Sequence, residues 1–103
     1  MIRVSVLYPV TPGAKFDMDY YLKKHMPMVK AKLGAAMKGA TVEKGVSGGA
    51  PGTPATYGVI AHLTFDSVDA FSKAMAPVAN EIMGDIPNYT TIAPVMQISD
   101  VLL

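Results

Sequence analysis

The sequence predicts an α+β fold in which a strand–helix–strand unit occurs twice in succession. Three observations support this: four segments have the composition of strands, two have the apolar spacing of helices, and residues that favour turns separate them. A chain of 103 residues is close to the usual size of one domain, so we assign residues 1–103 to a single domain.

The first strand is predicted at residues 2–10, where branched apolar residues alternate with other types. The alternation places four side chains on one face of the strand, namely Ile2, Val4, Val6 and Tyr8. Pro9 and the turn residues 11–13 end the strand.

The first helix is predicted at residues 17–33, with Asp17 placed to cap its start. A period of about 3.6 residues gives an apolar stripe on one face. This stripe consists of Met18, Leu22, Val29 and Leu33, with Lys23 and Lys30 on the opposite face. His25 falls inside the stripe. Because Pro27 lacks a backbone donor, the helix is predicted to kink or restart beside His25.

The second strand is predicted at residues 38–46 and the third, more clearly, at residues 57–65. Val59, Ala61 and Leu63 share one face of the third strand, whereas His62 lies on the opposite face. The intervening segment 47–54 has the glycine content of a phosphate-binding loop. It lacks the Gly-Lys-Ser/Thr ending and no helix follows it, so we interpret it as a flexible hairpin loop.

The second helix is predicted to begin after Ser67, a natural N-cap, and to be interrupted by Pro77. Its apolar stripe consists of Val68, Phe71, Met75, Val78, Ala79 and Ile82. A turn-rich connector follows at residues 84–90, and the last strand is predicted at residues 91–103.

This order of elements predicts a ferredoxin-like βαββαβ sandwich with a four-stranded antiparallel sheet. The first and third strands should be central, and both helices should cover one face of the sheet. The other face carries apolar positions that nothing in the chain covers. We therefore expect a homodimer in which the two sheets enclose a shared interior.

Composition excludes several classes of protein. Half of the residues are hydrophobic, 17% are charged, and the net charge of +1 offers no electrostatic basis for binding nucleic acid or an anionic membrane. The absence of cysteine excludes disulfides, a thiolate nucleophile and an iron–sulfur site. No segment resembles a signal peptide or a membrane span, so we expect a soluble, cytoplasmic protein.

The candidate catalytic residues are His25, His62 and Tyr8. Imidazole titrates near neutral pH and is the commonest general acid or base, and the Tyr8 hydroxyl can contact a ligand. The alternative for each histidine is a structural role with a hydrogen bond to the backbone. Two histidines without cysteine or clustered carboxylates form an incomplete metal site, and no motif supports haem or flavin. We therefore predict no metal and no cofactor.

The chain contains 8 methionines, a high number for its length. Because the methionine side chain is flexible and polarisable, these residues suit an adaptable apolar interior that binds a hydrophobic ligand. Ordinary filling of the core is the alternative interpretation.

Two segments together resemble the EthD family, which is named for ethyl tert-butyl ether degradation. The first segment is Phe16-Asp17-x-Asp19-Tyr20-Tyr21-x-x-x-His25-x-Pro27-x-Val29. The second is Asp85-Ile86-Pro87-Asn88-Tyr89-Thr90, followed by Pro94-Val95-Met96-Gln97-Ile98. With the strand order between them, the resemblance covers nearly the whole chain.

The resemblance implies a dimeric α/β barrel and a role in small-molecule catabolism. The implied activity is cofactor-independent acid–base chemistry on a small hydrophobic compound that is aromatic, lactone-like or ether-derived. The family is loosely described as oxidoreductase-related, which leaves open an accessory role beside a partner oxygenase, or ligand binding without catalysis. Matched residue by residue, the motifs imply ligand-binding positions at Asp17, Tyr21, Tyr89 and Thr90.

Overall fold

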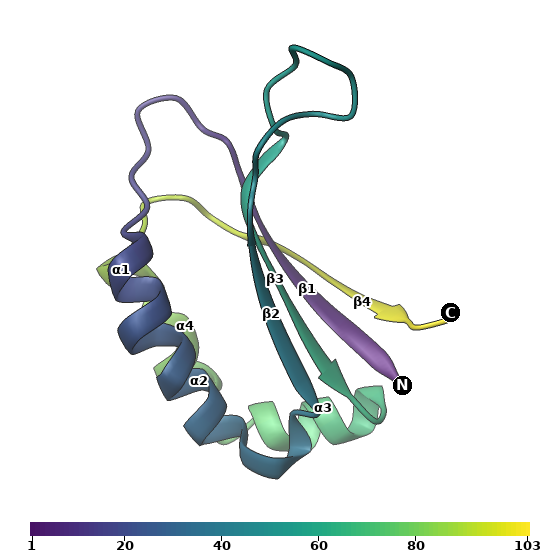
Figure 1. The fold of residues 1–103 in the computed structure, drawn as a ribbon. Helices are drawn as coiled ribbons and strands as arrows, with labels where there is room; N and C mark the ends of the chain where they lie inside the picture. The colour runs from purple at the N-terminus through teal and green to yellow at the C-terminus, as the bar shows by residue number, and fades with distance from the viewer.

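A computed structural model describes all residues of the protein, Met1–Leu103. Its sheet has four strands in the order β2-β3-β1-β4, and every neighbouring pair is antiparallel. The strands are β1 (Ile2–Pro9), β2 (Gly39–Lys44), β3 (Tyr57–Phe65) and β4 (Val95–Asp100). The first and third strands are central, as predicted, and the fold is the expected ferredoxin-like sandwich (Figure 1).

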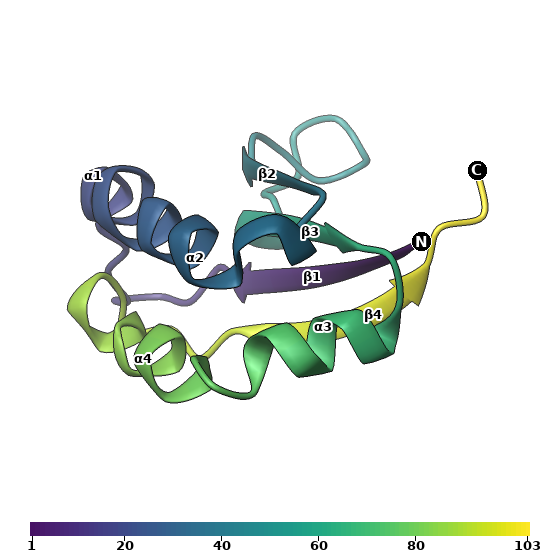
Figure 2. The same ribbon diagram turned by 90° about the horizontal axis from the view of Figure 1, so that it is seen from below.

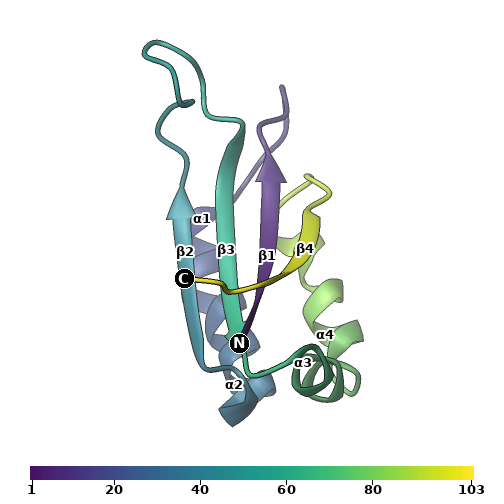
Figure 3. The ribbon, with the colours of Figure 1, turned by 90° about the vertical axis from the view of Figure 1, so that its right-hand side faces the viewer.

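All helices lie on one face of the sheet. Figure 3 looks onto the other face, which no helix covers. The α-helices are α1 (Met18–Tyr20), α2 (Met26–Leu33), α3 (Val68–Met75) and α4 (Ala79–Gly84). Tyr21–His25 is a π-helical turn, and Gly34–Ala36 and Ile86–Asn88 are short 3₁₀ segments. No helix is both long enough and apolar enough to span a lipid bilayer.

The core lies between the helices and the helix-facing side of the sheet (Figure 2). The predicted alternation holds in β1 and β3, where one side chain in two is buried against the helices. The buried strand residues are Ile2, Val4, Tyr8, Val59, Ala61, Leu63 and Phe65. The register pairs each buried residue of β1 with a residue of the same face of β3, so the two central strands form one apolar surface.

The first helix is interrupted beside His25, as predicted, and a new α-helix, α2, begins at Met26 with Pro27 in its first turn. The interruption takes the form of a π-helical turn just before Pro27, where the backbone N–H of Met26 donates to the carbonyl of Tyr21. The π-turn allows Tyr21 and His25, four residues apart, to be buried together. The predicted stripe is therefore wrong at Leu22, which is 48% exposed.

The second helical region matches its prediction more closely. The Ser67 side chain accepts a hydrogen bond from the backbone N–H of Ala70, as an N-cap does. The helix breaks between α3 and α4 around Pro77, as predicted.

The last strand begins later than predicted, at Val95 rather than residue 91. Its expected first residue pairs elsewhere, because the N–H of Thr91 donates to the carbonyl of Lys15 at 3.3 Å, next to a bridge between Thr90 and Phe16. Pro94 also lacks the N–H that a strand ladder requires. The residues after the second helix are thereby tied to the start of the first helix.

Candidate functional site

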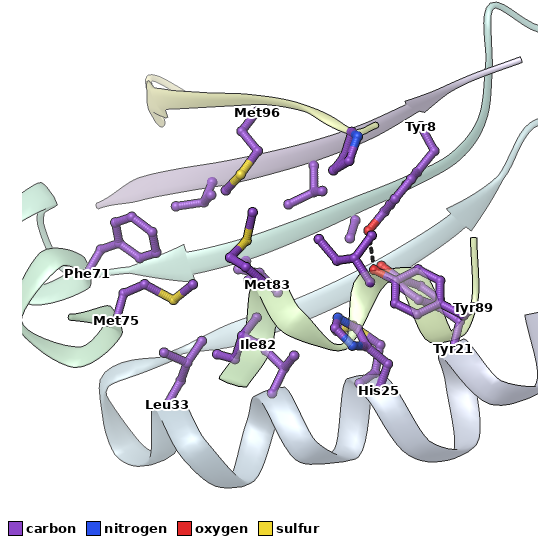
Figure 4. A pocket seen from close by; sticks show the side chains of 18 residues that line it. Tyr8, Tyr21, His25, Leu33, Phe71, Met75, Ile82, Met83, Tyr89 and Met96 are labelled. Carbon is purple, nitrogen blue, oxygen red and sulfur yellow. Dashed lines mark hydrogen bonds between the residues drawn. The ribbon is translucent and has the colours of Figure 1, made fainter. Parts of the chain in front are cut away.

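A small apolar cavity lies between the helices and the sheet. It has a volume of about 50 Å³ and is lined by 18 residues, of which 16 are hydrophobic. Figure 4 shows that the lining side chains come from both layers of the sandwich. Met83 and Met96 line the cavity and are each 43% exposed, so the cavity meets solvent where they lie. Apart from the tyrosines, His25 is the only lining residue with an acidic or basic side chain.

The π-helical turn places His25 at this cavity, where it is 5% exposed. Its Nδ1 lies 2.9 Å from Oδ2 of Asp85, which follows α4. The other carboxylate oxygen, Oδ1, accepts hydrogen bonds from the Tyr20 hydroxyl at 2.6 Å and the Asn88 amide at 2.9 Å. Asp85 therefore joins the first helix to the connector.

The charge of Asp85 fixes the direction of its bond to His25. Burial raises the pKa of Asp85, but hydrogen bonds from Tyr20, Asn88 and His25 outweigh burial and hold this pKa below its ordinary value of 3.8. At neutral pH the carboxylate is ionised and only accepts hydrogen bonds. Nδ1 of His25 must therefore be the donor, and in the neutral ring Nε2 carries the lone pair.

The other ring nitrogen of His25, Nε2, makes no hydrogen bond within the chain. No fully enclosed side-chain nitrogen or oxygen lacks a hydrogen-bond partner, so Nε2 borders open space. Since the ring lines the cavity, we infer that Nε2 is directed toward it. The arrangement can accept a proton from a molecule bound there and return it.

Three predicted tyrosines meet at the same cavity. The hydroxyls of Tyr8 and Tyr89 are hydrogen-bonded at 2.6 Å, and the ring of Tyr21 is stacked on His25 with centroids 5.4 Å apart (Figure 4). Burial raises the pKa of Tyr8, Tyr21 and Tyr89 above the ordinary value of 10.0. All three are therefore neutral phenols that can donate a hydrogen bond at physiological pH.

Asp17 and Thr90, two predicted ligand-binding residues, lie outside the cavity lining. The Asp17 side chain caps α1 by accepting from the N–H of Tyr20 at 3.1 Å, and its own N–H donates to the carbonyl of Tyr89 at 2.7 Å. The Thr90 hydroxyl donates to the carbonyl of Lys15 at 2.6 Å. These contacts hold the helix that carries His25 against the connector that carries Asp85.

His62 lies on the opposite face of the sheet from His25. Its Nδ1 is 3.0 Å from the Ser5 hydroxyl, and its Nε2 is 3.4 Å from a carboxylate oxygen of Glu43. The strand register places Ser5 and Thr41 beside it on the uncovered face. The two histidines therefore do not share a site.

Three residues of the site, Asp85, Asn88 and Tyr20, were not among the candidate site residues predicted from the sequence. Asp85 and Asn88 belong to the second family motif, which was a usable signal. Their convergence on His25 was not visible in the sequence, because 60 residues separate His25 from Asp85 and 65 separate Tyr20 from Asp85.

Comparison with known proteins identifies the family. A model of the EthD domain matches residues 14–92, a range that includes His25 and Asp85. The structure matches that of an EthD-like protein from Ralstonia eutropha with a TM-score of 0.93 and 51% sequence identity, covering 99% of this chain and 92% of that one. No curated protein matches the sequence.

Two more distant structures show the same fold. An ethyl tert-butyl ether degradation (EthD) family protein from Bacillus halodurans has a TM-score of 0.68 at 14% identity, with 99% of each chain covered. A protein from Arabidopsis thaliana has a TM-score of 0.72 at 18% identity, with 100% of this chain and 97% of that one covered. At such identities the likeness concerns the fold alone.

Proposed function

The chain belongs to the EthD family, and on this premise we propose that it binds a small hydrophobic molecule in the cavity and that His25 transfers a proton to or from it without a cofactor. The observation that carries the proposal is the pair of His25 and Asp85, with Nδ1 held by the carboxylate and Nε2 facing an apolar cavity. A histidine that only stabilised the fold would not need a free ring nitrogen at the cavity.

The pair supports a general acid–base role for His25. Asp85 orients the imidazole and favours the tautomer whose Nε2 accepts a proton, and it stabilises the imidazolium that then forms. The apolar walls exclude water from the bound molecule and strengthen electrostatic interactions inside the cavity. Asp85 is therefore a positioning residue and His25 the proposed catalytic residue.

The size of the cavity limits the ligand. A volume of about 50 Å³ is well below the roughly 150 Å³ of an engineered cavity that admits benzene. Four of the lining residues are methionines, namely Met26, Met75, Met83 and Met96. Because methionine changes rotamer at little cost, these residues allow the cavity to widen around a small apolar molecule.

The proposed active form is a homodimer. The uncovered face of the sheet carries a row of apolar residues, Ile60, Leu7 and Val95, which the register places side by side. Val95 is 50% exposed in the single chain. Burial of this row against a second copy is the simplest way to remove it from water.

The test uses methionine methyl groups as reporters, because the chain has no tryptophan. The protein with ¹³C-labelled methionine methyls is mixed with a panel of small lactones, phenols and alkyl ethers, and binding is detected by NMR. Ligands in the cavity should shift the signals of Met75, Met83 and Met96 and leave those of Met1 and Met37 in place.

Turnover of the compounds that bind is then followed by NMR. Replacement of His25 by alanine should lower the rate by about a hundredfold to ten-thousandfold, the usual contribution of a general acid or base. Asp85→Asn should also lower the rate, because Asp85 positions the imidazole. Asp69→Asn is its matched control, since Asp69 is an exposed carboxylate paired with Lys73. Binding without any chemistry that depends on His25 would reject the catalytic role. Loss of turnover in His62→Ala with activity retained in His25→Ala would reject the choice of histidine.

A further inference from the structure

Three tyrosine hydroxyls converge on the cavity from three parts of the chain. Tyr8 lies near the end of β1, Tyr21 begins the π-helical turn, and Tyr89 follows the last 3₁₀ segment. Their ring centroids are 5.0 to 6.2 Å apart in each pairing. They are the only hydroxyl groups among the lining residues.

The three hydroxyls have more O–H donors than there are acceptors for them within the chain. The Tyr8 and Tyr89 hydroxyls are hydrogen-bonded at 2.6 Å, and the Tyr21 hydroxyl also donates to that of Tyr8. Three hydroxyls joined by two hydrogen bonds use two of their three protons, so one donor remains for a molecule in the cavity.

The donors lie beside His25. The Tyr21 ring is stacked on the imidazole with an interplanar angle of 15°, and the Tyr89 centroid lies 4.6 Å from that of His25. Figure 4 draws the Tyr8–Tyr89 hydrogen bond at the same end of the cavity as His25. The cavity contains no lysine or arginine to balance an ionised ligand. It suits a neutral molecule with one acceptor oxygen and an otherwise apolar body.

We propose that the hydroxyls of Tyr8, Tyr21 and Tyr89 bind a carbonyl oxygen, and that the substrate class is a small neutral carbonyl compound with a hydrogen on the adjacent carbon. This inference rests on the proposed role of His25 as a base. Burial keeps the three phenols protonated at neutral pH, so they remain donors while charge develops on the oxygen.

The step balances within the residues present. The Nε2 lone pair of His25 takes the proton from the carbon next to the carbonyl, and the electrons of that C–H bond form a C=C bond. The carbonyl π electrons move to the oxygen, which becomes an enolate that accepts hydrogen bonds from the tyrosines. Return of the proton from the imidazolium to carbon regenerates His25, and no oxidant or reductant is consumed.

The test compares two probes of similar shape, cyclopentanone and methylenecyclopentane. The first has a carbonyl oxygen where the second has a CH₂ group. The measured quantity is the ratio of their affinities, from NMR titration of the cavity methionines. Replacing all three tyrosines by phenylalanine should lower the preference for the ketone by about tenfold or more, since a buried acceptor then loses its donors. Tyr57→Phe is the matched control, because Tyr57 lies outside the cavity lining.

The triple variant is expected to fold, because the Tyr8 and Tyr89 hydroxyls satisfy each other and are removed together. If it does not, the double variant Tyr8→Phe/Tyr89→Phe gives the same comparison. An unchanged affinity ratio in the folded variant would overturn the assignment of the tyrosines.

A second readout separates this inference from the proposed function. In D₂O, the wild type should exchange the ring hydrogens next to the carbonyl of cyclopentanone for deuterium, and His25→Ala should abolish the exchange while keeping the ketone preference. Exchange that depends on His25 but not on the tyrosines would overturn the tyrosine site and keep the proposed function. A ketone preference without exchange that depends on His25 would overturn the enolisation step and the proposed function.

Discussion

Asp85 accepts three hydrogen bonds from donors in two separate parts of the chain. His25 and Tyr20 belong to the first helix, and Asn88 belongs to the connector after α4. The bond to Asp85 raises the pKa of Tyr20, so its hydroxyl stays a donor. A carboxylate held in this way orients the imidazole and keeps Nε2 directed into the cavity.

This hydrogen bonding also predicts how stability depends on pH. The pKa of Asp85 is lower in the folded protein than its ordinary value of 3.8, so the unfolded chain binds a proton first as the pH falls. The stabilisation is complete above pH 3.8 and is lost as the pH falls toward the folded-state pKa. In urea unfolding below pH 3.8, Asp85→Asn should therefore show a smaller loss of stability with falling pH than the wild type.

The exposed carboxylate of Asp69 supplies the control for this measurement. Asp69→Asn should retain the pH dependence of the wild type. Equal pH dependence in Asp85→Asn and the wild type would mean that the three hydrogen bonds do not stabilise the charged form of Asp85.

At this scale the sequence predicted four residues that lie together at the cavity but not the residues that they contact. His25, Tyr8, Tyr21 and Tyr89 were predicted from residue type, local pattern and family motif, and all four line the cavity. Asp17 was expected in a ligand-binding role as well as at the helix start, and its side chain caps the helix and lies outside the cavity lining. The pairing of His25 with Asp85 depends on tertiary contacts, which no local pattern encodes.

At the scale of the element, the first helix depends on the π-helical turn before Pro27. The missing N–H of Pro27 predicted that the helix would be disturbed there. It did not predict that the disturbance would be a π-helical turn. A continuous α-helical period placed Leu22 inside, whereas the wider turn exposes Leu22 and buries Tyr21. One π-helical turn was enough to change which side chain reaches the cavity.

The end of the same helix gives a test of backbone strain. Gly34, at the C-cap of α2, has φ 58° and ψ −140°, a conformation that residues with a Cβ rarely adopt. Nothing lies within 4 Å of a Cβ added there, so any cost of Gly34→Ala is conformational. We expect a loss of about 1–3 kcal/mol in the free energy of unfolding.

Gly84→Ala is the matched control for this substitution. Gly84 ends α4, its φ is not positive, and an added Cβ would also meet nothing within 4 Å. Alanine there should leave the protein equally stable or raise its stability by up to about 1 kcal/mol. The comparison is made by urea unfolding, and equal effects of the two substitutions would contradict the strain at Gly34.

At the scale of the whole molecule, the dimer is proposed because the helices cover one face of the sheet and leave the other face uncovered. The order of strands and helices was predictable, because the first and third strands had a clear alternation and residues that favour turns separated the elements. The start of β4 was not, since residues 90 and 91 pair with the beginning of the first helix rather than with the sheet. That pairing brings together the two halves of the family motif.

The dimer has a direct test by light scattering. The wild type should have twice the 10.9 kDa mass of one chain at micromolar concentration. Val95→Glu places a charge on the uncovered face and should shift the protein toward monomers, because an interface there would bury the charge. Val68→Glu is the control, since Val68 is also 50% exposed but lies on α3. A monomeric wild type, or an equal effect of the two variants, would count against this interface.

The central claim is that Asp85 fixes the tautomer of His25 so that a basic Nε2 faces the cavity. Long-range ¹H–¹⁵N NMR of the two histidines tests this most directly, because it distinguishes a ring nitrogen with a proton from one with a lone pair and needs no ligand. We predict that neutral His25 carries its proton on Nδ1, and that Asp85→Asn weakens this preference. A neutral His25 with its proton on Nε2 would contradict the account, since the nitrogen at the cavity would then have no lone pair to accept a proton.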